Sequence, residues 1–192
     1  MTAPQSKVFV ITGPSGVGKG SLIGRLRQEH PEIELSVSAT TRRPRAGEAD
    51  GVDYHFLSPE DFNTRVEAGE FLEHARYSGN RYGTLRSEVE HRIENGHPVV
   101  LEIEVQGARQ IRNTMPGAVQ VFIAPPRLES LRQRLESRGT DGSEAIEARL
   151  EVAEEELRAR GEFPHEVVND DLDRAAGELE AIVRRKLSES SA

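Results

Sequence analysis

The stretch GPSGVGKGSL, residues 13–22, decides how the rest of the chain is interpreted. It comes close to the phosphate-binding loop pattern, in which two glycines separated by four residues precede Lys and then Ser or Thr. Gly13, Gly18 and Lys19 fit this pattern. The next position does not, because Gly20 stands where the hydroxyl residue belongs and Ser21 follows one place late. The stretch is therefore a variant of the loop, and its flanks decide whether it can bind phosphate.

The flanks of this loop match the structural context that the motif requires. Residues 7–12 (KVFVIT) form a β-branched and aromatic run that predicts a buried strand. Leu22, Ile23 and Leu26 recur at helical spacing, so residues 19–29 are expected to form a helix. A strand, a glycine loop and a helix in this order bring converging N–H groups and the positive end of a helix dipole to one point.

The loop is therefore predicted to bind the phosphates of a nucleotide, with the lysine ammonium reaching the β- and γ-phosphates. The alternative is an ordinary glycine-rich turn between a strand and a helix. The three motif glycines, the lysine in register and the flanking elements favour the nucleotide site. The predicted ATP-phosphate residues are Gly13, Pro14, Ser15, Gly16, Val17, Gly18, Lys19, Gly20 and Ser21.

The remaining periodicity predicts strands that alternate with helices. Strands are expected at residues 35–39, 99–105 and 119–123, with a last one starting at 166, and helices at 59–69, 84–95, 126–138, 143–160 and 170–187. This alternation is typical of an α/β fold with a mostly parallel central sheet flanked by helices. Residues 36–96 depart from it, because they are rich in loops, glycine, tyrosine and arginine, and they are interpreted as an inserted lobe.

The bulk composition limits the classes of partner. The chain has 192 residues and a net charge of −8, whereas binding nucleic acid or a membrane surface through general electrostatics calls for a basic protein, so neither partner is expected. It has no cysteine, which excludes disulfides, thiolate metal sites and cysteine nucleophiles. No stretch resembles a signal peptide or is long enough to cross a bilayer, so a cytoplasmic location is expected.

Further motifs follow the loop in order. They are SVSATTRRPRAGEADGVDYHF (36–56), FLEHARYSGNRYGT (71–84), LEIEVQGA (101–108), FIAPP (122–126), RLESRGTD (134–141) and VVNDDLD (167–173). Together with the loop they resemble the guanylate kinase family over residues 7–187. The resemblance implies transfer of the γ-phosphoryl group of ATP to GMP, and a P-loop nucleoside-monophosphate-kinase fold. It implies a single domain, 1–192, with a core of about 5–35, 97–125 and 161–187, a GMP-binding lobe of about 36–96 and a helical lid of about 126–160.

Two arginines of the inserted region suit a monophosphate. Arg42 and Arg45 flank Pro44, and a guanidinium group binds phosphate oxygens through two N–H groups at once. Without further information, the two arginines would be interpreted as part of an exposed charged loop. Tyr54 and Tyr82 would be interpreted as ordinary residues at the edge of a core. The resemblance instead assigns these two arginines and two tyrosines to the phosphate of GMP.

Guanine recognition falls, by the same resemblance, to Glu73 with Ser38 and Thr84. Guanine presents two adjacent donors, N1–H and the N2 amine, which one carboxylate accepts side by side, while hydroxyls can donate to O6. Adenine would leave the carboxylate unpaired, and a site of this kind rejects such an analogue by roughly 10⁴-fold or more. The alternative for Glu73 is a solvated carboxylate at the end of a helix.

Two further carboxylates stand where the family has acidic residues at a strand end. Glu102 and Glu104 alternate along the strand expected at 99–105, which predicts that both point to one face. Glu104 is included in the GMP site, although the family more often has Asp at this position. The extra methylene leaves open whether this carboxylate meets guanine, an arginine or hydrated magnesium.

The resemblance also implies a lid and a set of catalytic residues. Arginines that close over the nucleotides in the family match Arg134, Arg138 and Arg149. The predicted catalytic residues are therefore Lys19, Arg42, Arg134, Arg138 and Arg149. Arg134 is also expected at the ATP site, together with Asn169, whose family counterpart lies near the adenine.

Phosphoryl transfer depends on positioning and charge stabilisation more than on covalent chemistry. The acceptor is a phosphate oxygen of GMP, which is mostly deprotonated at neutral pH because its second pKa is about 6, so no general base is nominated. Magnesium is the expected cofactor. Gly20 cannot ligate it, and the ion is expected near Ser21 and Glu104 but mainly on oxygens of ATP and on water. The expected reaction is a direct in-line transfer between the two nucleotides.

Other functions are compatible with part of these motifs. Guanylate-kinase-like domains of scaffold proteins bind phosphopeptides without catalysis, but they tend to lose the phosphate loop that is intact here. A kinase for another nucleoside monophosphate would share the loop, and Glu73, Ser38 and Thr84 argue against it. A plain P-loop ATPase or GTPase would leave the arginine-rich lobe without a task, and the chain has no NKxD motif.

Overall fold

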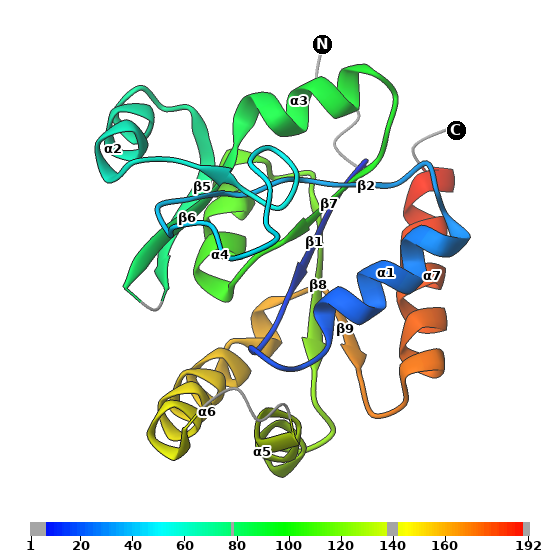
Figure 1. Ribbon diagram of the computed structural model, residues 1–192. Coiled ribbons are helices and arrows are strands. Elements are labelled where there is room, and N and C mark those ends of the chain that lie inside the picture. Colours follow the sequence, from blue (N-terminus) through cyan, green and yellow to red (C-terminus); the bar gives the residue numbers. More distant parts are fainter. Residues whose placement is uncertain (1–6, 78, 138–141, 190–192) are drawn as a thin grey trace.

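The computed structural model describes residues 7–77, 79–137 and 142–189 (Figure 1). Its central strand, β1 (Val8–Thr12), leads through the glycine loop directly into helix α1 (Lys19–Glu29). Every residue of β1 is buried, and α1 buries Leu22, Ile23 and Leu26. The predicted strand, loop and helix are confirmed.

The strand β1 lies in the middle of a five-stranded parallel sheet. The strand order is β2 (Glu34–Leu35), β7 (Val99–Glu102), β1, β8 (Val119–Ala124) and β9 (His165–Val168). All neighbouring pairs run parallel, so the carboxyl ends of the strands meet at one edge. The predicted α/β fold with a mostly parallel central sheet is therefore confirmed, and this edge is where such sheets bind ligands.

Helices cover both faces of this sheet. Phe9 and Ile11 of β1 pack in the cluster that includes α1 and α7 (Leu172–Glu189). Val8 and Val10 pack in the opposite cluster, with α3 (Arg86–Glu94) and α4 (Val105–Thr114). The alternation follows the period of two of a strand. Burying each side chain of this size stabilises the fold by about 1.5–3 kcal/mol, which anchors the loop that follows β1.

A second, small sheet lies beside the first. Its strand order is β4 (His55–Phe56), β3 (Ala39–Thr40), β6 (Asn80–Leu85) and β5 (Phe71–Tyr77). Strands β5 and β6 form an antiparallel hairpin, and Phe62 of α2 (Pro59–Glu67) stacks on Phe71 with ring centroids 4.5 Å apart. Figure 1 shows the small sheet and α2 on the far side of β1 from α1 and α7. The region interpreted as an inserted lobe thus has a small core of its own.

Two further helices lie near the carboxyl edge of the main sheet. They are α5 (Leu128–Ser137) and α6 (Ser143–Arg158), and a short 3-10 helix, Arg160–Glu162, follows them. Leu135 and Leu150 join these helices to the cluster on the α1 side. Figure 1 shows the pair at the lower end of the molecule, near the loop that follows β1. Within the described ranges, no helix has both the length and the apolar character needed to cross a membrane.

Three sequence predictions of elements were wrong. Residues 35–39 are not one strand, because Leu35 ends β2 in the main sheet and Ala39 begins β3 in the small sheet. The strand expected at 99–105 ends at Glu102, and α4, which was not predicted, begins three residues later. Apolar and acidic residues alternate in LEIEV as they do in a strand, and this alternation continues past Glu102, where β7 ends. The helix expected from Thr84 begins at Arg86, because Thr84 belongs to the β5–β6 hairpin, which was also missed.

Candidate active site

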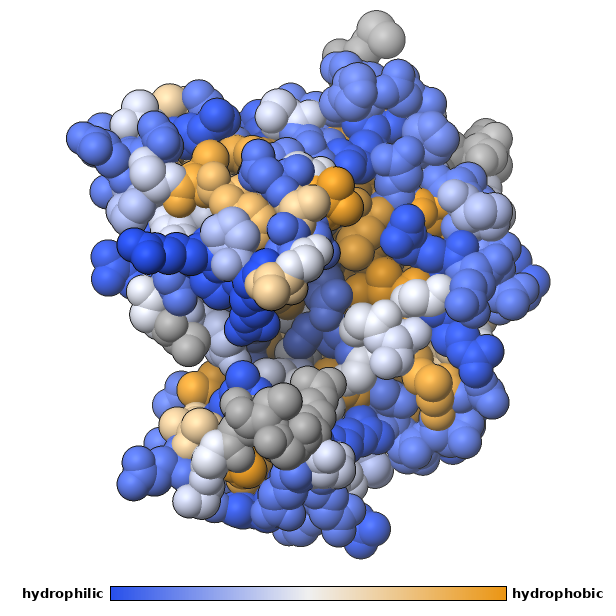
Figure 2. All heavy atoms as spheres, in the orientation of Figure 1, coloured by the Kyte–Doolittle hydropathy of each residue, from blue (hydrophilic) through white to orange (hydrophobic). Residues whose placement is uncertain are grey.

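A cleft of about 660 Å³ opens at the carboxyl edge of the main sheet. The loop after β1 and the start of α1 line one side, and residues of the small sheet line the other. Glu102, Ile103 and Glu104, at the end of β7 and just beyond it, lie between them. Figure 2 shows the surface hollowed between the part that carries the small sheet and the part that carries α5 and α6.

The glycines of the loop adopt conformations that other residues rarely adopt. The φ angles of Gly13, Gly16 and Gly18 are 137°, 81° and 98°. A Cβ on Gly13 would lie 2.2 Å from the carbonyl oxygen of Ile123, and one on Gly18 would lie 2.5 Å from Nδ2 of Asn169. The concave turn that the phosphate motif requires is thus built by the three predicted glycines.

Lys19 is the first residue of α1 and only 8 % of it is exposed. Its Nζ donates to the carbonyl oxygens of Gly13 and Pro14, at 2.5 and 3.2 Å, so the ammonium group is folded over its own loop. A buried ammonium group needs such partners. Because Lys19 also lines the cleft, an anion in the cleft can take over these hydrogen bonds.

Two side chains from distant parts of the chain contact the loop. Nδ2 of Asn169 and Nη1 of Arg134 both donate to the carbonyl oxygen of Val17, at 2.7 and 2.9 Å. Arg134 comes from α5, and Asn169 follows β9. Both were predicted at the ATP site. Both contact its loop, but neither lines the cleft.

The residue that replaces the usual hydroxyl lies next to a carboxylate. A Cβ on Gly20 would lie 3.8 Å from Oε2 of Glu102, and both residues line the cleft with Ser21. Burial in the walls of the cleft raises the pKa of Glu102, and the nearby Lys19 ammonium opposes this rise. Hydroxyl and carboxylate oxygens suit magnesium, but the described residues include no group of three acidic or histidine side chains placed to hold a metal ion. This donor set fits an ion that takes most of its ligands from elsewhere.

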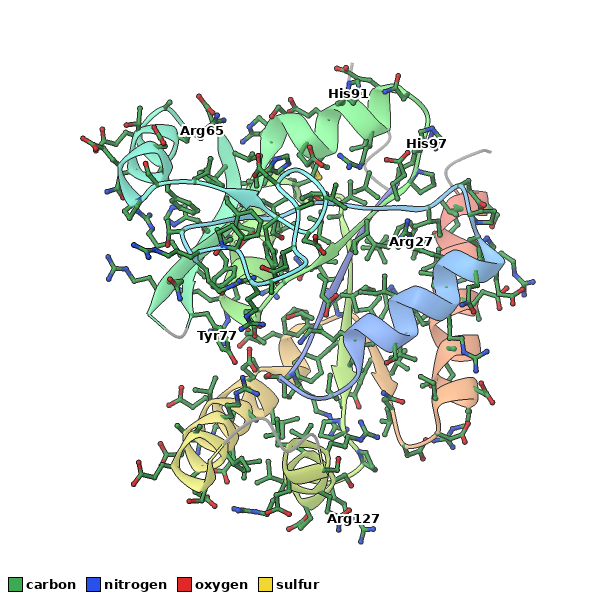
Figure 3. The ribbon with its side chains drawn as sticks, viewed as in Figure 1. Arg27, Arg65, Tyr77, His91, His97 and Arg127 are labelled. Atoms are coloured by element: carbon green, nitrogen blue, oxygen red, sulfur yellow. The ribbon has the colours of Figure 1, made fainter. Side chains whose placement is uncertain are left out.

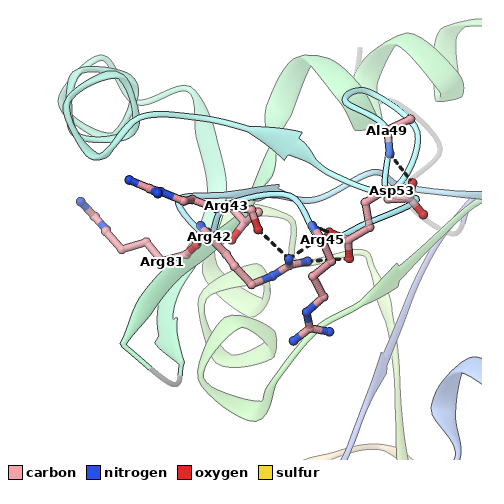
Figure 4. A network of polar contacts seen from close by, with 8 residues as sticks. Arg42, Arg43, Arg45, Ala49, Asp53 and Arg81 are labelled. Carbon is pink, nitrogen blue, oxygen red and sulfur yellow. Dashed lines mark hydrogen bonds and ion pairs between the residues drawn. The ribbon is translucent and has the colours of Figure 1, made fainter.

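The segment of Arg42 to Arg45 folds around one carboxylate (Figure 4). Nη1 and Nη2 of Arg42 donate to the two oxygens of Glu48 at 2.9 and 2.8 Å. The backbone N–H of Arg45 donates to the same carboxylate at 2.7 Å. These hydrogen bonds raise the pKa of Arg42 and lower that of Glu48. Arg42 is therefore held in place by the protein itself, whereas Arg45 is exposed.

Two tyrosines lie between this arginine segment and the cleft. The Arg42 guanidinium group lies 5.2 Å from the centroid of the Tyr54 ring and contacts Tyr82. The two tyrosine rings meet edge to face with centroids 6.0 Å apart, and both line the cleft. Burial raises the pKa of Tyr54, so its hydroxyl stays protonated and able to donate at neutral pH. Both predicted tyrosines are therefore within the site.

Glu73 is a buried carboxylate on β5, with 4 % of the residue exposed. Thr84, its partner across the hairpin, donates its hydroxyl to Oε1 at 2.7 Å. Oε2 packs against Gly107 of α4, where a Cβ would lie only 2.3 Å away. Burial raises the pKa of Glu73 to about 7, although the hydrogen bond from Thr84 opposes this rise. The alternative of a solvated carboxylate at a helix end is excluded.

Glu104 does not lie on a strand but is the N-cap residue of α4, so the prediction that it shares a strand face with Glu102 was wrong. Both carboxylates nevertheless line the cleft. Glu104 lies next to Glu156 of α6, which is 8 % exposed. Burial and the neighbouring Glu104 carboxylate raise the pKa of Glu156.

The cleft gathers most of the predicted site residues. Those that line it are Pro14, Ser15, Gly16, Gly18, Lys19, Gly20, Ser21, Ser38, Tyr54, Glu73, Tyr82 and Glu104. Those that do not line it are Gly13, Val17, Arg42, Arg45, Thr84, Arg134, Arg149 and Asn169. Arg138 lies outside the described residues.

Sequence reasoning missed several residues of this site, among them four with polar or charged side chains. Asp53 and Tyr77 line the cleft, and Tyr77, labelled in Figure 3, is the last residue of β5. Both lie inside motifs that were recognised, which was a usable signal. Glu48 lies inside the motif of residues 36–56 as well, but only the fold pairs it with Arg42. Glu156 carries no such signal, because it is one of many acidic residues and only the fold places it next to Glu104.

One cleft joins the glycine loop to the buried carboxylate of Glu73. An arginine segment that follows β3 contacts Tyr54, which lines this cleft. This fold and this site define the class of P-loop nucleoside monophosphate kinases.

Comparisons with known proteins identify the family within this class. The family model described as guanylate kinase matches residues 5–186. The guanylate kinase of Synechococcus sp. (strain CC9311) is 57 % identical over 171 residues, 89 % of this chain and 90 % of that protein. That of Prochlorococcus marinus (strain MIT 9313) is 52 % identical over 182 residues, 95 % and 96 % of the two chains. The crystal structure of guanylate kinase from Anaplasma phagocytophilum superposes with a TM-score of 0.74 and 33 % identity, covering 93 % of this chain and 85 % of that one. The chain belongs to the guanylate kinase family.

Proposed function

We propose that this chain transfers the γ-phosphoryl group of ATP to GMP, and to dGMP, by direct in-line transfer that gives ADP and GDP. The observation that carries the proposal is the single cleft that joins the loop around Lys19 to the buried pair of Glu73 and Thr84. Membership of the guanylate kinase family supports the same ATP:GMP phosphotransfer.

The loop of residues 13–21 binds the phosphates of ATP. The free N–H groups of the glycine turn and of the first turn of α1 surround the anion, and the helix dipole adds positive potential. Lys19 exchanges the carbonyl oxygens of Gly13 and Pro14 for oxygens of the β- and γ-phosphates. Hydrogen bonds to charged acceptors are about twice as strong as those to neutral ones, which favours this exchange.

The phosphate of GMP is held by Arg42, Arg45, Tyr54 and Tyr82. The pairing with Glu48 uses the edge of the Arg42 guanidinium group that carries Nη1 and Nη2, which leaves Nε for a phosphate oxygen. Arg45 is exposed and adds a positive charge that its side chain can move toward the anion. A dianionic phosphate group suits this combination of guanidinium and hydroxyl donors.

Guanine is read by the carboxylate of Glu73, which accepts N1–H and the N2 amine when it is ionised. Thr84 has a single hydroxyl proton and donates it to Glu73, so its role is to orient the carboxylate. The donor to O6 is then Ser38, which lines the same cleft. Glu104 completes this end of the site from the start of α4.

Helices α5 and α6 act as the lid over a core of about 5–35, 97–125 and 161–187, and residues 36–96 act as the GMP-binding lobe. Arg138 and Arg149 move toward the phosphates as negative charge spreads in the transition state, an effect worth roughly 10³-fold or more in rate. Arg134 acts on the same end of the site by holding the carbonyl of Val17 in the loop. Closure also excludes water, which would otherwise hydrolyse ATP.

Magnesium bound with ATP neutralises charge between the phosphate oxygens. In this chain Ser21, Glu102 and Glu104 carry the oxygens next to the loop that would hold the hydrated ion, with most of its ligands supplied by ATP and water. No general base is required, because the acceptor oxygen of GMP is already deprotonated at neutral pH.

The test is to incubate the protein with ATP, magnesium and each nucleoside monophosphate in turn, and to measure ADP. Formation of ADP only with GMP and dGMP is expected. Equal activity with AMP or UMP would contradict the assignment of Glu73 as a guanine reader. No activity with any monophosphate, together with retained binding of GMP, would favour a non-catalytic binding module.

A further inference from the structure

The peptide between Val17 and Gly18 is held from outside the loop. The carbonyl oxygen of Val17 accepts from Nδ2 of Asn169 at 2.7 Å and from Nη1 of Arg134 at 2.9 Å. Nη2 of Arg134 also donates to the backbone carbonyl of Asn169 at 2.8 Å. The three residues form a closed hydrogen-bond network, in which Arg134 bridges the carbonyl of Val17 and the backbone carbonyl of Asn169.

Asn169 is positioned by the main sheet. Its N–H donates to the carbonyl of Ala124 at 2.8 Å, one step beyond the paired residues Ala124 and Val168 of β8 and β9. Only 4 % of Asn169 is exposed, and it does not line the cleft. Nδ2 of its side chain donates to the loop, and the adenine contact implied by the family resemblance stays a prediction.

The direction of the Val17 carbonyl determines the direction of the next N–H. The described peptide bonds are trans, and in a trans peptide the C=O and the following N–H point opposite ways. Because the carbonyl points at Asn169 and Arg134, the N–H of Gly18 points away from them. Within the described part of the chain no hydrogen bond uses this N–H, and Gly18 lines the cleft.

Asn169 also accounts for the glycine at position 18. Gly18 has a φ of 98°, and a Cβ there would lie 2.5 Å from Nδ2 of Asn169. A side chain at this position would therefore push the amide away from the Val17 carbonyl. The loop and Asn169 are fitted to each other, which is not required of a residue whose task is to contact the adenine.

We infer that Asn169 is a positioning residue that holds the Val17–Gly18 peptide with the Gly18 N–H facing the phosphates of ATP. Arg134 of α5 reinforces this hold from the lid. The inference rests on the proposed role of the loop as the ATP site. Without the hold, rotation of this peptide would turn a carbonyl oxygen toward the phosphates and replace an attraction by a repulsion.

The test compares Asn169→Leu, which keeps the size of the side chain but has no donor, with Asn169→Asp, which can only accept. Binding of ATP, inorganic tripolyphosphate, adenosine and GMP is measured by calorimetry. ATP and tripolyphosphate are expected to weaken by the same factor, about tenfold or more, because a positioned donor is lost. Adenosine and GMP are expected to bind as in the unchanged protein.

Gln120→Leu is the matched control, because Gln120 is also a buried amide that donates to a backbone carbonyl, that of Ala108 at 2.8 Å. It should lower the melting temperature without changing the ratio of ATP to GMP affinity. Loss of ATP and adenosine binding with tripolyphosphate unchanged would assign Asn169 to the adenine and overturn the inference. Unchanged binding of all ligands, or equal loss of all, would also overturn it.

The variant Lys19→Ala distinguishes failure of this inference from failure of the proposed function. If Lys19→Ala does not weaken tripolyphosphate, the loop is not the phosphate site, and the inference fails with that assignment. If Lys19→Ala weakens tripolyphosphate and both Asn169 variants leave it unchanged, the loop assignment stands and only the role of Asn169 is wrong.

Discussion

The two proposed anion-binding ends of the cleft are built from different parts of the chain. At the loop the donors are backbone N–H groups, held by glycines without room for a Cβ and by a buried Lys19. At the small sheet the donors are side chains: Arg42 is held by its pair with Glu48 and by contacts with the two tyrosines, while Arg45 is exposed. The proposed ATP end is therefore preformed by the fold, whereas the proposed GMP end depends on a few side-chain contacts.

The largest effect is expected at the preformed end. Lys19→Ala should lower turnover by about 10³-fold, because the positive charge that stabilises the transferred phosphoryl group is removed from a site with little water. Binding of GMP should stay within about twofold, since the hydrogen bonds of Lys19 in the described structure go to its own loop and not to the small sheet. Steady-state formation of GDP and calorimetry with GMP measure the two quantities.

Lys186→Ala is the matched control for this variant, because Lys186 is one of the three lysines and contacts Glu189 near the end of α7. It should leave turnover unchanged. Formation of GDP by Lys19→Ala at a near-normal rate would contradict the assignment of the loop.

The next largest effect is expected for the binding of guanine, at the end of the cleft formed by the small sheet. In the proposed site GMP binds the ionised form of Glu73, and burial raises the pKa of this carboxyl group to about 7. The affinity for guanosine, which lacks the titrating phosphate, should therefore be about tenfold lower at pH 6 than above pH 8. The same affinity should be weak and independent of pH in Glu73→Gln. A flat profile in the unchanged protein would show that Glu73 is not the guanine reader.

The raised pKa of Glu73 also has a consequence for folding. The unfolded chain releases the proton near pH 4.5, whereas the folded chain keeps it up to about pH 7. Because the folded state binds the extra proton in this window, the contribution of Glu73 to stability falls as the pH rises from 4.5 to 7 and is constant above it. Thermal unfolding of Glu73→Gln should lack this slope.

The smallest effect is expected at the pair that holds Arg42. Glu48→Gln replaces one acceptor oxygen by an NH₂ group that faces the guanidinium donors, so Arg42 is no longer fixed in one orientation. The KM for GMP should rise by about tenfold, the KM for ATP should stay unchanged, and the affinity for guanosine should not change.

Glu70→Gln is the control for Glu48, since it breaks the exposed pair of Arg65 and Glu70 in the same small-sheet region, 3.0 Å apart. Exposed pairs of this kind contribute little, so GMP binding should be unaffected. An equal rise of KM for GMP in both variants would mean that the region is disturbed as a whole, and the special role of Glu48 would be refuted.

The contrast between the loop, which is one local stretch of sequence, and the small-sheet end, which combines distant side chains, also explains how much could be predicted from the sequence. The loop could be recognised because its chemistry is local: the glycines, Lys19 and the flanking strand and helix all lie within residues 7–29. The parallel sheet could be predicted for the same reason, from runs of apolar residues. Helix α4 could not, because alternation in LEIEV continues the pattern of β7 across the point where the strand ends.

The environment of the acidic residues could not be read from the sequence. Burial of Glu73 depends on Gly107, which comes from a different element and leaves room for the carboxylate. The contact of Glu104 with Glu156 depends on where α6 packs, and the sequence offers several acidic residues in that helix. The roles of Ser38, Glu73 and Thr84 came from the family resemblance, and their geometry from the fold.

The central claim is that one cleft holds two separate anion sites, one formed by the loop and one by the arginine segment. Its most direct test is calorimetric titration of ATP and of GMP into Lys19→Ala and into Arg42→Ala. The predicted result is a crossed pattern, in which Lys19→Ala loses affinity for ATP and keeps GMP, and Arg42→Ala loses affinity for GMP and keeps ATP. Loss of both nucleotides to the same degree in either variant would contradict the claim.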